Sequence, residues 1–467
     1  MIEKIKNTLK KRWGGNCGYA EVLRVGLPLV VSMASVTVIL FTDRLFLSHY
    51  SLDAIAAALP AGLVHLTIML TLTGLCAYSS VFIAQYTGAG QKEKVGLALW
   101  QGIWIGLICS TLFTLCYFIA DIIFSFGDHS QNIKMLEIAY FRILCLGATP
   151  FLLNAVLGGF YAGRGITKPV LWANLLAAFI NIPLDYILIF GKFGFPELGV
   201  EGAALASVAG ALAGTIFFIF LIFTKENEEL FKVLSNYKFN AELIKKILRY
   251  GTPSGINLFL ELFSVTWFVF IVGQLGKLEL AATNIAFSIN SLVFVPMLGL
   301  NMAAATLVGQ SMGRNKPDEA ERATENTLHL AFAYMLPVAM FMLLAPEFLL
   351  GLFKPKDMDM VLFNNLLATG KILLAFIAVY SLVDACNLVY FGALKGAGDT
   401  MFFMILMSCS ATLLIIGLEL AKRFGFAELN VYWSIFTVYV FLLAFLSRKR
   451  FLSKKWQNIR LITSEKK

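Results

Sequence analysis

Long apolar stretches, separated by short polar or charged segments, recur along the whole chain. Crossing a bilayer as a helix takes about 20 residues, and Gly or Pro within such a stretch is compatible with a membrane helix. The pattern predicts twelve transmembrane helices near residues 23–48, 56–82, 96–120, 138–161, 169–191, 200–224, 250–275, 281–308, 327–346, 366–394, 401–420 and 430–447.

Composition agrees with this pattern. The chain has 467 residues, of which 58% are hydrophobic and 14% charged, whereas soluble proteins have about 25% charged residues. One membrane anchor on a soluble enzyme would not lower the average so far. Disorder is excluded as well, because disordered chains have low hydrophobicity. We expect an all-α polytopic membrane protein.

Basic residues indicate the orientation of the chain. With the N-terminus inside, the cytoplasmic segments hold 27 Lys and Arg residues and the external segments hold 7. Basic residues are retained on the cytoplasmic side of membrane proteins. We expect a multi-pass protein of the cell membrane (the inner membrane in a bacterium) with both termini in the cytoplasm. The same bias explains the net charge of +9 without a nucleic-acid partner.

The two halves of the chain resemble each other. Three pairs of similar segments are each separated by 225 residues, and Arg164-Gly165 matches Lys395-Gly396 at a separation of 231 residues. The three pairs are Leu23-Arg24-x-Gly26-x-Pro28 with Leu248-Arg249-x-Gly251-x-Pro253, Ala56-Ala57 with Ala281-Ala282, and Gln85-x-x-Gly88 with Gln310-x-x-Gly313. Because each half has six spans, both halves enter from the same side and form a parallel repeat.

This duplication predicts five regions. They are a cytoplasmic N-terminal segment (1–22), an N-lobe of spans one to six (23–224), a cytoplasmic linker (225–248), a C-lobe of spans seven to twelve (249–447) and a basic cytoplasmic tail (448–467). Duplicated transporters hold their substrate between the repeats and work by alternating access.

Four carboxylates lie within predicted spans, where a charge is costly and therefore points to function. Counted at about 1.5 Å per residue from the basic end of each span, Asp43 and Asp185 lie about 28 and 25 Å deep. Glu261 and Asp384 lie about 18 and 16 Å deep. The four carboxylates thus form one depth-matched pair in each half.

Neighbouring polar residues extend both pairs. Asn181 lies four residues before Asp185 and Tyr380 four before Asp384, so each couple shares a helix face. Ser207 can lie at the depth of Asp185. Such oxygen groups suit a hard monovalent cation or a proton. Two structural alternatives remain open, namely an ion pair of Asp43 with Arg44 and a plain interhelical hydrogen bond at Asp185.

With these motifs assembled, the chain resembles the multidrug and toxic compound extrusion (MATE) family of cation-coupled exporters over nearly its whole length. The similar segments are Gly26-x-Pro28 with Asp43, Asn181-Ile-Pro-Leu-Asp185, Gly202-Ala-Ala-Leu-Ala-Ser207, Leu307-Val-Gly-Gln310-Ser-Met-Gly313, Phe259-Leu-Glu261, Tyr380 with Asp384, and Gly392-Ala-Leu-Lys-Gly396. The resemblance implies a MATE-like fold of twelve helices in two six-helix lobes.

The resemblance also implies roles for single residues. Asp43, Asn181, Asp185 and Ser207 correspond to the N-lobe site that binds Na⁺ or takes up a proton. Glu261, Tyr380 and Asp384 correspond to the C-lobe cation site of the NorM-type branch, a second cation-binding group. Na⁺ is a candidate ion at both groups, and the choice between H⁺ and Na⁺ stays open. Pro28 corresponds to the point where the first helix bends.

The implied function is an antiporter that exports amphipathic, often cationic, drugs or toxic compounds in exchange for H⁺ or Na⁺. We expect no enzyme activity and no cofactor, a monomer, and membrane lipids as surroundings. Two rivals stay open at this stage: a flippase for a lipid-linked oligosaccharide from the same superfamily, and a channel or receptor. The acidic charge within the spans argues against the flippase, which would need a basic cavity for pyrophosphate.

Overall fold

The computed structural model describes residues 12–126, 129–353 and 360–462, and within these ranges the chain forms helices and no strand. The first half contains α2 (Tyr19–Tyr50), α3 (Leu52–Cys76), α4 (Ser79–Gly88), α5 (Lys92–Thr114), η1 (Leu115–Ile119), α6 (Ala120–Ser125), α7 (Gln131–Leu146), α8 (Ala148–Gly163), α9 (Lys168–Phe190) and α10 (Val200–Ile222). The second half contains α11 (Lys225–Phe231), α12 (Ala241–Gly273), α13 (Lys277–Gly313), α14 (Pro317–Leu344), α15 (Pro346–Gly351), α16 (Met360–Ala397), α17 (Thr400–Arg423), α18 (Leu429–Leu452) and η2 (Lys455–Asn458).

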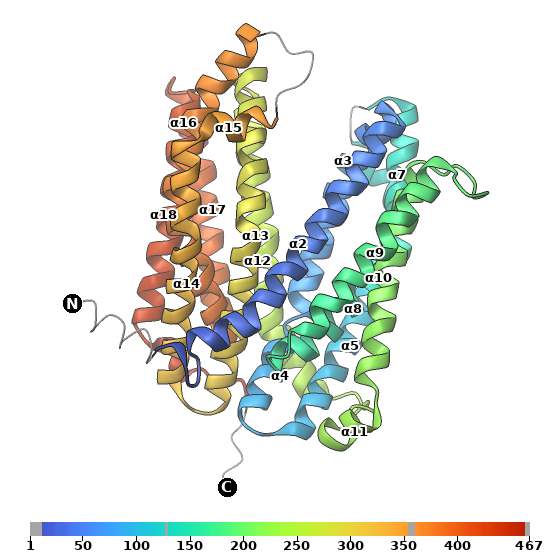
Figure 1. Ribbon diagram of the computed structural model, residues 1–467, viewed down its shortest axis with the longest axis vertical. Coiled ribbons are helices and arrows are strands. Elements are labelled where there is room, and N and C mark those ends of the chain that lie inside the picture. Colours follow the sequence, from blue (N-terminus) through green and yellow to red (C-terminus); the bar gives the residue numbers. More distant parts are fainter. Residues whose placement is uncertain (1–11, 127–128, 354–359, 463–467) are drawn as a thin grey trace. The chain divides into compact units, whose positions relative to one another are not determined.

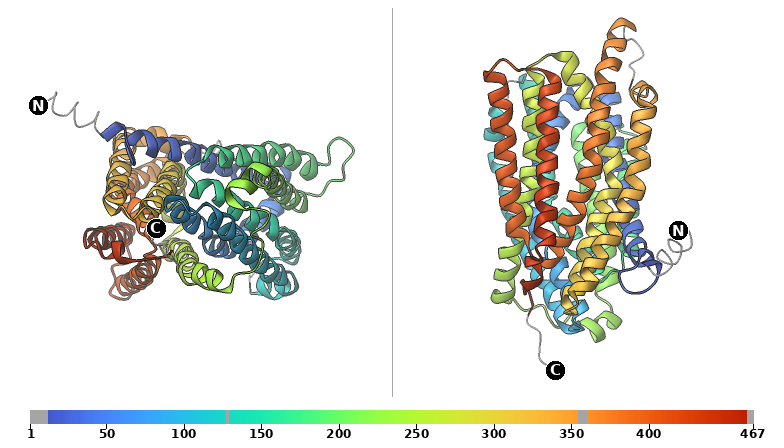
Figure 2. Two further views of the ribbon diagram at one scale, coloured as in Figure 1. Left: turned by 90° about the horizontal axis from the view of Figure 1, so that it is seen from below. Right: turned by 90° about the vertical axis from the view of Figure 1, so that its left-hand side faces the viewer.

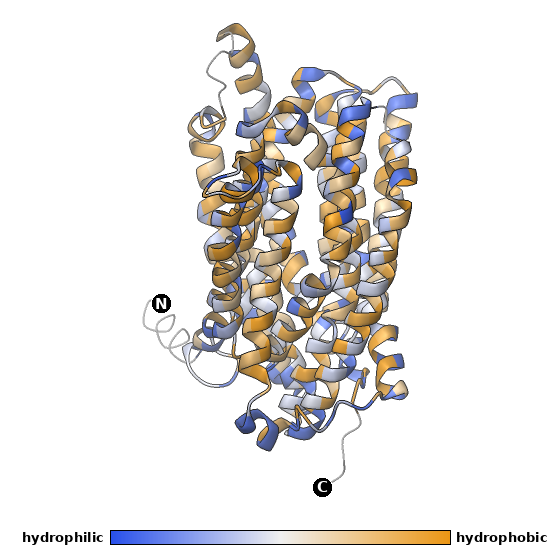
Figure 3. Cartoon of the chain, turned by 90° about the vertical axis from the view of Figure 1, so that its right-hand side faces the viewer, coloured by the Kyte–Doolittle hydropathy of each residue, from blue (hydrophilic) through white to orange (hydrophobic). Residues whose placement is uncertain are grey.

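The helices have the length and composition of membrane spans. Eleven in the described part of the chain can cross a bilayer, and the bent pair α7 and α8 brings the number to twelve. Apolar residues dominate along these helices and polar residues gather near their ends (Figure 3). The all-α fold predicted from the apolar pattern, with twelve spans, is confirmed.

The fourth span differs from the continuous helix predicted over 138–161. It bends by 46° between α7 and α8, at Gly147. Pro150 follows in the first turn of α8 and has no N–H to continue the hydrogen bonding of α7. A side chain at position 147 would collide with Val208 of α10, so glycine also allows close packing at the bend.

The chain forms two compact units. Among the described residues, one contains residues 12–23 together with Asn257–Val308 and Pro317–Ile459, and the other contains Arg24–Ile256, Gly309–Lys316 and residues 460–462. In the first unit α16 packs against α14 and α18 (Figure 1). In the second, α9 packs against α10 and α5 against α8 (Figure 2). The predicted boundaries between lobes and linker stay a prediction.

In the second unit, the two Gln-x-x-Gly motifs of the repeat lie against each other. A Cβ atom on Gly88 would collide with the main chain of Gln310, and one on Gly313 would collide with the main chain of Gln85. The side chain of Gln310 also donates to the carbonyl of Gly163 at 3.0 Å. The repeated glycines therefore allow the main chains of α4 and α13 to lie in direct contact near the C-terminal ends of the two helices.

Residues 225–248 are structured and dock onto α5. They comprise α11, a turn and the first residues of α12. The indole nitrogens of Trp100 and Trp104 donate to main-chain carbonyls of the turn at 2.5 and 2.9 Å. Gln101 donates to the carbonyl of Lys238 and accepts from the amide of Asn240. Three side chains of α5 thus hold this segment.

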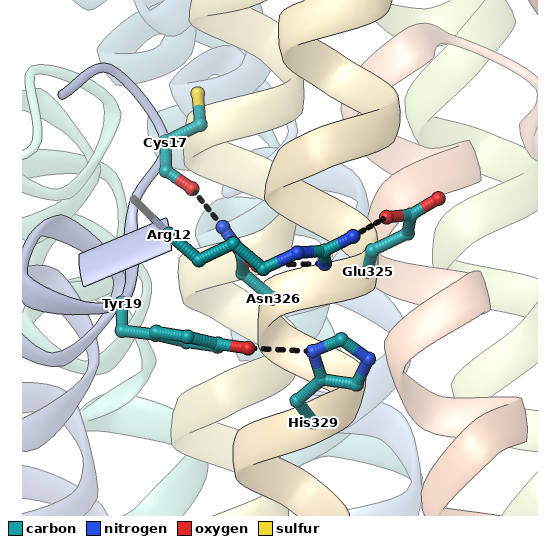
Figure 4. A network of polar contacts seen from close by, with 6 residues as sticks. All are labelled: Arg12, Cys17, Tyr19, Glu325, Asn326 and His329. Atoms are coloured by element: carbon teal, nitrogen blue, oxygen red, sulfur yellow. Dashed lines mark hydrogen bonds and ion pairs between the residues drawn. The ribbon is translucent and has the colours of Figure 1, made fainter. Parts of the chain in front are cut away.

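The N-terminal segment is anchored to α14 within the first unit (Figure 4). The buried side chain of Asn326 donates to the carbonyl of Cys17 at 2.7 Å and accepts from Arg12 at 3.2 Å. Two further contacts complete the network, Arg12 Nη2 to Glu325 Oε2 at 3.1 Å and Tyr19 Oη to His329 Nδ1 at 2.8 Å. The residues at the start of α2 are therefore fixed to a helix of the second half.

Candidate functional site

The second unit brings three of the predicted site residues together. Asp43 lies on α2, and Asn181 and Asp185 lie one turn apart on α9. Their exposed fractions are 6%, 1% and 0%, respectively. The charge of Asp43 acts on Asp185, so the two carboxylates lie within electrostatic range of each other. We call Asp43, Asn181 and Asp185 the first carboxylate cluster.

Hydrogen bonds position each member of this cluster. The amide of Asn181 is oriented so that its nitrogen donates to Asp185 at 3.2 Å and its oxygen accepts from the main-chain N–H of Ser207 at 3.3 Å. Tyr140 of α7 donates to Asp43 at 3.5 Å. Ser207 thus reaches the cluster through its main chain, whereas the sequence suggested a role for its hydroxyl.

Each carboxylate keeps one oxygen unsatisfied. Oδ1 of Asp43 and Oδ1 of Asp185 are buried without a hydrogen-bond partner in the described part of the chain. The side chain of Arg44 is exposed, and no ion pair joins it to Asp43 within the described residues. A buried carboxylate oxygen without a partner is costly. The cluster is therefore suited chemically to accept a proton or a hard cation between its oxygens.

Pro28 lies apart from the cluster, about four helical turns before Asp43 on α2. Because proline lacks an N–H, the carbonyl of Arg24 loses its helical partner. The hydroxyl of Thr167, just before α9, lies 3.4 Å from that carbonyl and donates to the carbonyl of Val25 at 2.8 Å. The interruption of helical hydrogen bonding in α2 is thus compensated by the buried side chain of Thr167, directly before α9.

The first unit contains the second group of predicted residues. Glu261 lies on α12, and Tyr380 and Asp384 lie one turn apart on α16. The charge of Asp384 acts on Glu261, which places the two carboxylates within electrostatic range. Tyr380 is buried, and its hydroxyl has no hydrogen-bond partner in the described part of the chain. We call Glu261, Tyr380 and Asp384 the second carboxylate cluster.

A chain of side chains positions Asp384. Asn387 donates to Asp384 Oδ1 at 3.1 Å, and Ser447 of α18 donates to Asn387 Oδ1 at 3.0 Å. Both donors are buried. The ring of Tyr380 stacks on Trp433 of α18 with centroids 6.5 Å apart. Helix α18 therefore holds both Asp384 and Tyr380 in place.

No group of three or more His, Cys, Asp or Glu side chains suited to a metal ion exists among the residues that the structure describes. Each cluster offers instead two carboxylates with neutral oxygens, from Asn181 and the Tyr140 hydroxyl in one and from Tyr380 in the other. Alkali cations accept such mixed oxygen ligands.

Several residues of these clusters were not identified from the sequence. Asn387 had a local signal, since it follows Asp384 by three residues on one helix face. Tyr140 and Ser447 had none, because they lie 97 and 60 residues from their partners. Thr167 likewise contacts residues more than 140 positions away.

The chain is similar to curated transporters over most of its length. It is 26% identical over 449 residues to a probable multidrug resistance protein NorM of Thermotoga maritima, covering 96% of this chain and 95% of the relative. It is 28% identical over 391 residues to a probable NorM of Bradyrhizobium diazoefficiens, with 82% of each chain covered.

The fold is also similar to solved structures. An outward-facing multidrug resistance MATE family transporter of the MOP superfamily aligns with a TM-score of 0.86 and 22% identity, covering 94% of this chain and 97% of that one. At this identity the likeness shows the fold, and it agrees with the twelve-helix architecture.

The family model MatE matches the chain twice, over residues 28–187 and 253–420. The two matches begin at Pro28 and Pro253, which are equivalent positions of the internal repeat. Together they cover more than half of the sequence. The chain therefore belongs to the multidrug and toxic compound extrusion (MATE) family of membrane transporters.

Proposed function

We propose that the protein is a secondary active antiporter that exports amphipathic, often cationic, compounds in exchange for H⁺ or Na⁺. The observation that carries the proposal is the pair of carboxylate clusters. Each cluster holds two acidic side chains within apolar helices, and none of the four forms an ion pair within the described residues. Retaining such groups inside a membrane costs at least about 2.5 kcal/mol each.

The clusters supply a means of coupling. A cation that occupies a carboxylate pair neutralises charge that would otherwise attract a cationic cargo. Cation and cargo therefore need only compete for these carboxylates, or favour different conformations, to be linked thermodynamically. In the first cluster the unsatisfied oxygens of Asp43 and Asp185 are the atoms available to the ion. In the second cluster the available groups are Glu261, Asp384 and the free hydroxyl of Tyr380.

Helix α2 supports alternating access as the mechanism. It carries Asp43 and, about four helical turns earlier, Pro28. The bond between Thr167 and the main chain around Pro28 is a contact that bending of α2 would break or remake. Occupation of Asp43 can therefore change the shape of α2 at this point, and the affinity for cargo changes with it.

The surroundings of the protein follow from its charge distribution. The 27 to 7 distribution of basic residues supports a cell-membrane protein with both termini in the cytoplasm. Transport of this kind requires no bound cofactor, and we expect a monomer in contact with membrane lipids. The names of the curated relatives, which are probable multidrug resistance proteins, support a drug-like cargo.

Transport by the purified full-length chain in liposomes tests the proposal. Efflux of ethidium, an amphipathic cation, is followed under a sodium gradient at equal pH and, separately, under a pH gradient at equal sodium. We expect at least one gradient to accelerate efflux, and an ionophore that dissipates that gradient to abolish the acceleration. Efflux no faster than from protein-free liposomes under both gradients would rule out cation-coupled antiport of this cargo.

A further inference from the structure

Asn257, near the second carboxylate cluster, is buried, and the polar atoms of its side-chain amide have no hydrogen-bond partner in the described part of the chain. The residue is 1% exposed, and neither Oδ1 nor Nδ2 forms a hydrogen bond in the described part of the chain. Leaving an amide buried and unpaired costs about 1–3 kcal/mol. Nothing in the sequence distinguishes this residue, because a single Asn within an apolar span is common.

The position of Asn257 relates it to the cluster. It precedes Glu261 by four residues on α12, so the two side chains lie one turn apart on one helix face. Glu261 is exposed whereas Asn257 is buried. Both belong to the same compact unit as Tyr380 and Asp384. The unpaired amide therefore lies one turn from Glu261, the carboxylate on which the charge of Asp384 acts.

The position equivalent to Asn257 in the first half of the repeat has a hydrogen-bond partner. The residue 225 positions earlier is Ser32 on α2, which is buried and accepts a hydrogen bond from Asn174 of α9. The residue 231 positions after Asn174, at the offset that relates these later segments, is Ile405 of α17. An isoleucine side chain offers no hydrogen bond. The second half thus has a polar side chain at one of the two equivalent positions and an apolar one at the other.

We propose that Asn257 is a ligand of the coupling cation in the second carboxylate cluster, where it favours Na⁺ over H⁺. Its Oδ1 atom is a neutral oxygen that a hard alkali cation accepts, and an amide does not take up a proton at physiological pH. Its Nδ2 group can donate to Glu261 and hold that carboxylate in the charged form. Asp384 contributes charge, with its Oδ1 already bonded to Asn387.

The inference rests on the proposed cation coupling, but it can be tested by binding alone. A ligand that binds only the folded state stabilises it by RT ln(1 + [L]/Kd), so the melting temperature rises with ligand concentration and affinity. We would compare NaCl with choline chloride at equal ionic strength, using the purified full-length protein. The wild type is expected to show a sodium-specific rise in melting temperature.

The informative variant is Asn257→Leu, which keeps the branched shape and the number of side-chain heavy atoms and removes both polar atoms. A merely unsatisfied amide would leave the sodium-specific rise intact, because its removal changes the stability equally with and without sodium. We expect instead that the apparent affinity for Na⁺ falls by about tenfold or more, which corresponds to about 1.4 kcal/mol. Ser410→Ala is the matched control, since Ser410 is also buried and unpaired in this unit but lies on α17.

The outcomes separate this inference from the proposed function. Proton-driven efflux by a wild type that shows no sodium-specific rise would overturn the role of Asn257 and leave antiport standing. A sodium-specific rise that is equal in the wild type and Asn257→Leu would overturn it as well. A rise lost only in Asn257→Leu, in a protein without gradient-driven efflux, would support the sodium ligand and contradict the proposed function.

Discussion

The hydroxyl of Thr167 donates to the carbonyl of Val25 at 2.8 Å, beside the carbonyl that Pro28 deprives of its helical partner. Thr167 is 2% exposed, so the hydrogen bond forms away from bulk water. We expect Thr167→Val to lower the free energy of unfolding by about 1–3 kcal/mol, because the variant leaves these carbonyls with one donor fewer. The melting temperature in detergent is the measurement.

Thr167→Ser is the control for this prediction, since it keeps the hydroxyl. If Thr167→Val and Thr167→Ser both melted at the wild-type temperature, the hydroxyl of Thr167 would contribute nothing to the stability of the protein.

The contact between the two Gln-x-x-Gly motifs leads to a second prediction. A methyl group at Gly88 would collide with the main chain of Gln310, which cannot rotate away as a flexible side chain can. We expect Gly88→Ala to destabilise the protein by about 1–3 kcal/mol, as overpacking does in other cores. Thermal unfolding measures the effect.

Gly351→Ala serves as its comparison, because nothing lies within 4 Å of a Cβ at that position. An equal melting temperature for Gly88→Ala and the wild type would show that α4 and α13 do not cross in contact in the folded protein.

Two neighbouring residues of α14 that hold the N-terminal segment, Asn326 and Glu325, should differ in their contribution to stability. Asn326 is fully buried and donates to the carbonyl of Cys17, whereas the partner of Arg12, Glu325, is 54% exposed. We expect Asn326→Leu to cost about 1–3 kcal/mol, and Glu325→Gln to cost less than about 1 kcal/mol, as exposed ion pairs do. Melting temperatures and proteolysis of the N-terminal segment report both effects, and a larger loss for Glu325→Gln would contradict the account.

These contacts show what the sequence can predict. Apolar runs define the spans because each helix must match the bilayer thickness, and the carboxylates are conspicuous because charge is rare there. The partners of the carboxylates are not conspicuous. Tyr140 and Ser447 are ordinary residues of their helices, and only packing between distant helices makes them hydrogen-bond donors to the clusters.

The bend after α7 escapes prediction for a related reason. Gly and Pro occur in many straight membrane helices, so Gly147 and Pro150 alone do not distinguish a bend from a continuous span. Only the close approach of Val208 of α10, which leaves no room for a side chain at position 147, shows why glycine is needed there.

A pH dependence is expected outside the membrane spans, in the turn after α11. The Ser235 hydroxyl and the amide of Leu234 donate to Glu228 and hold its pKa below the ordinary value of 4.5. Because the pKa is lowered in the folded state, the stabilisation is complete above the unfolded value and disappears as the pH falls through the folded value. Hydrogen-exchange protection of the Leu234 amide should follow this course.

Glu228→Gln removes the charge at every pH. The variant is expected to show weaker protection of Leu234 near neutral pH and a smaller dependence on pH. Unchanged protection in the variant would mean that the turn is held by other contacts.

Gradient-driven efflux of ethidium from liposomes by Asp43→Asn and by Asp384→Asn is the most direct test of the carboxylate clusters. Asp121→Asn is the matched control, because Asp121 is exposed and paired with Arg142 outside both clusters. The account predicts that efflux by each cluster variant is slower than wild-type efflux by about tenfold or more, because removal of one carboxylate weakens binding of the coupling cation, while the control transports as the wild type does. Wild-type rates in both cluster variants would contradict it.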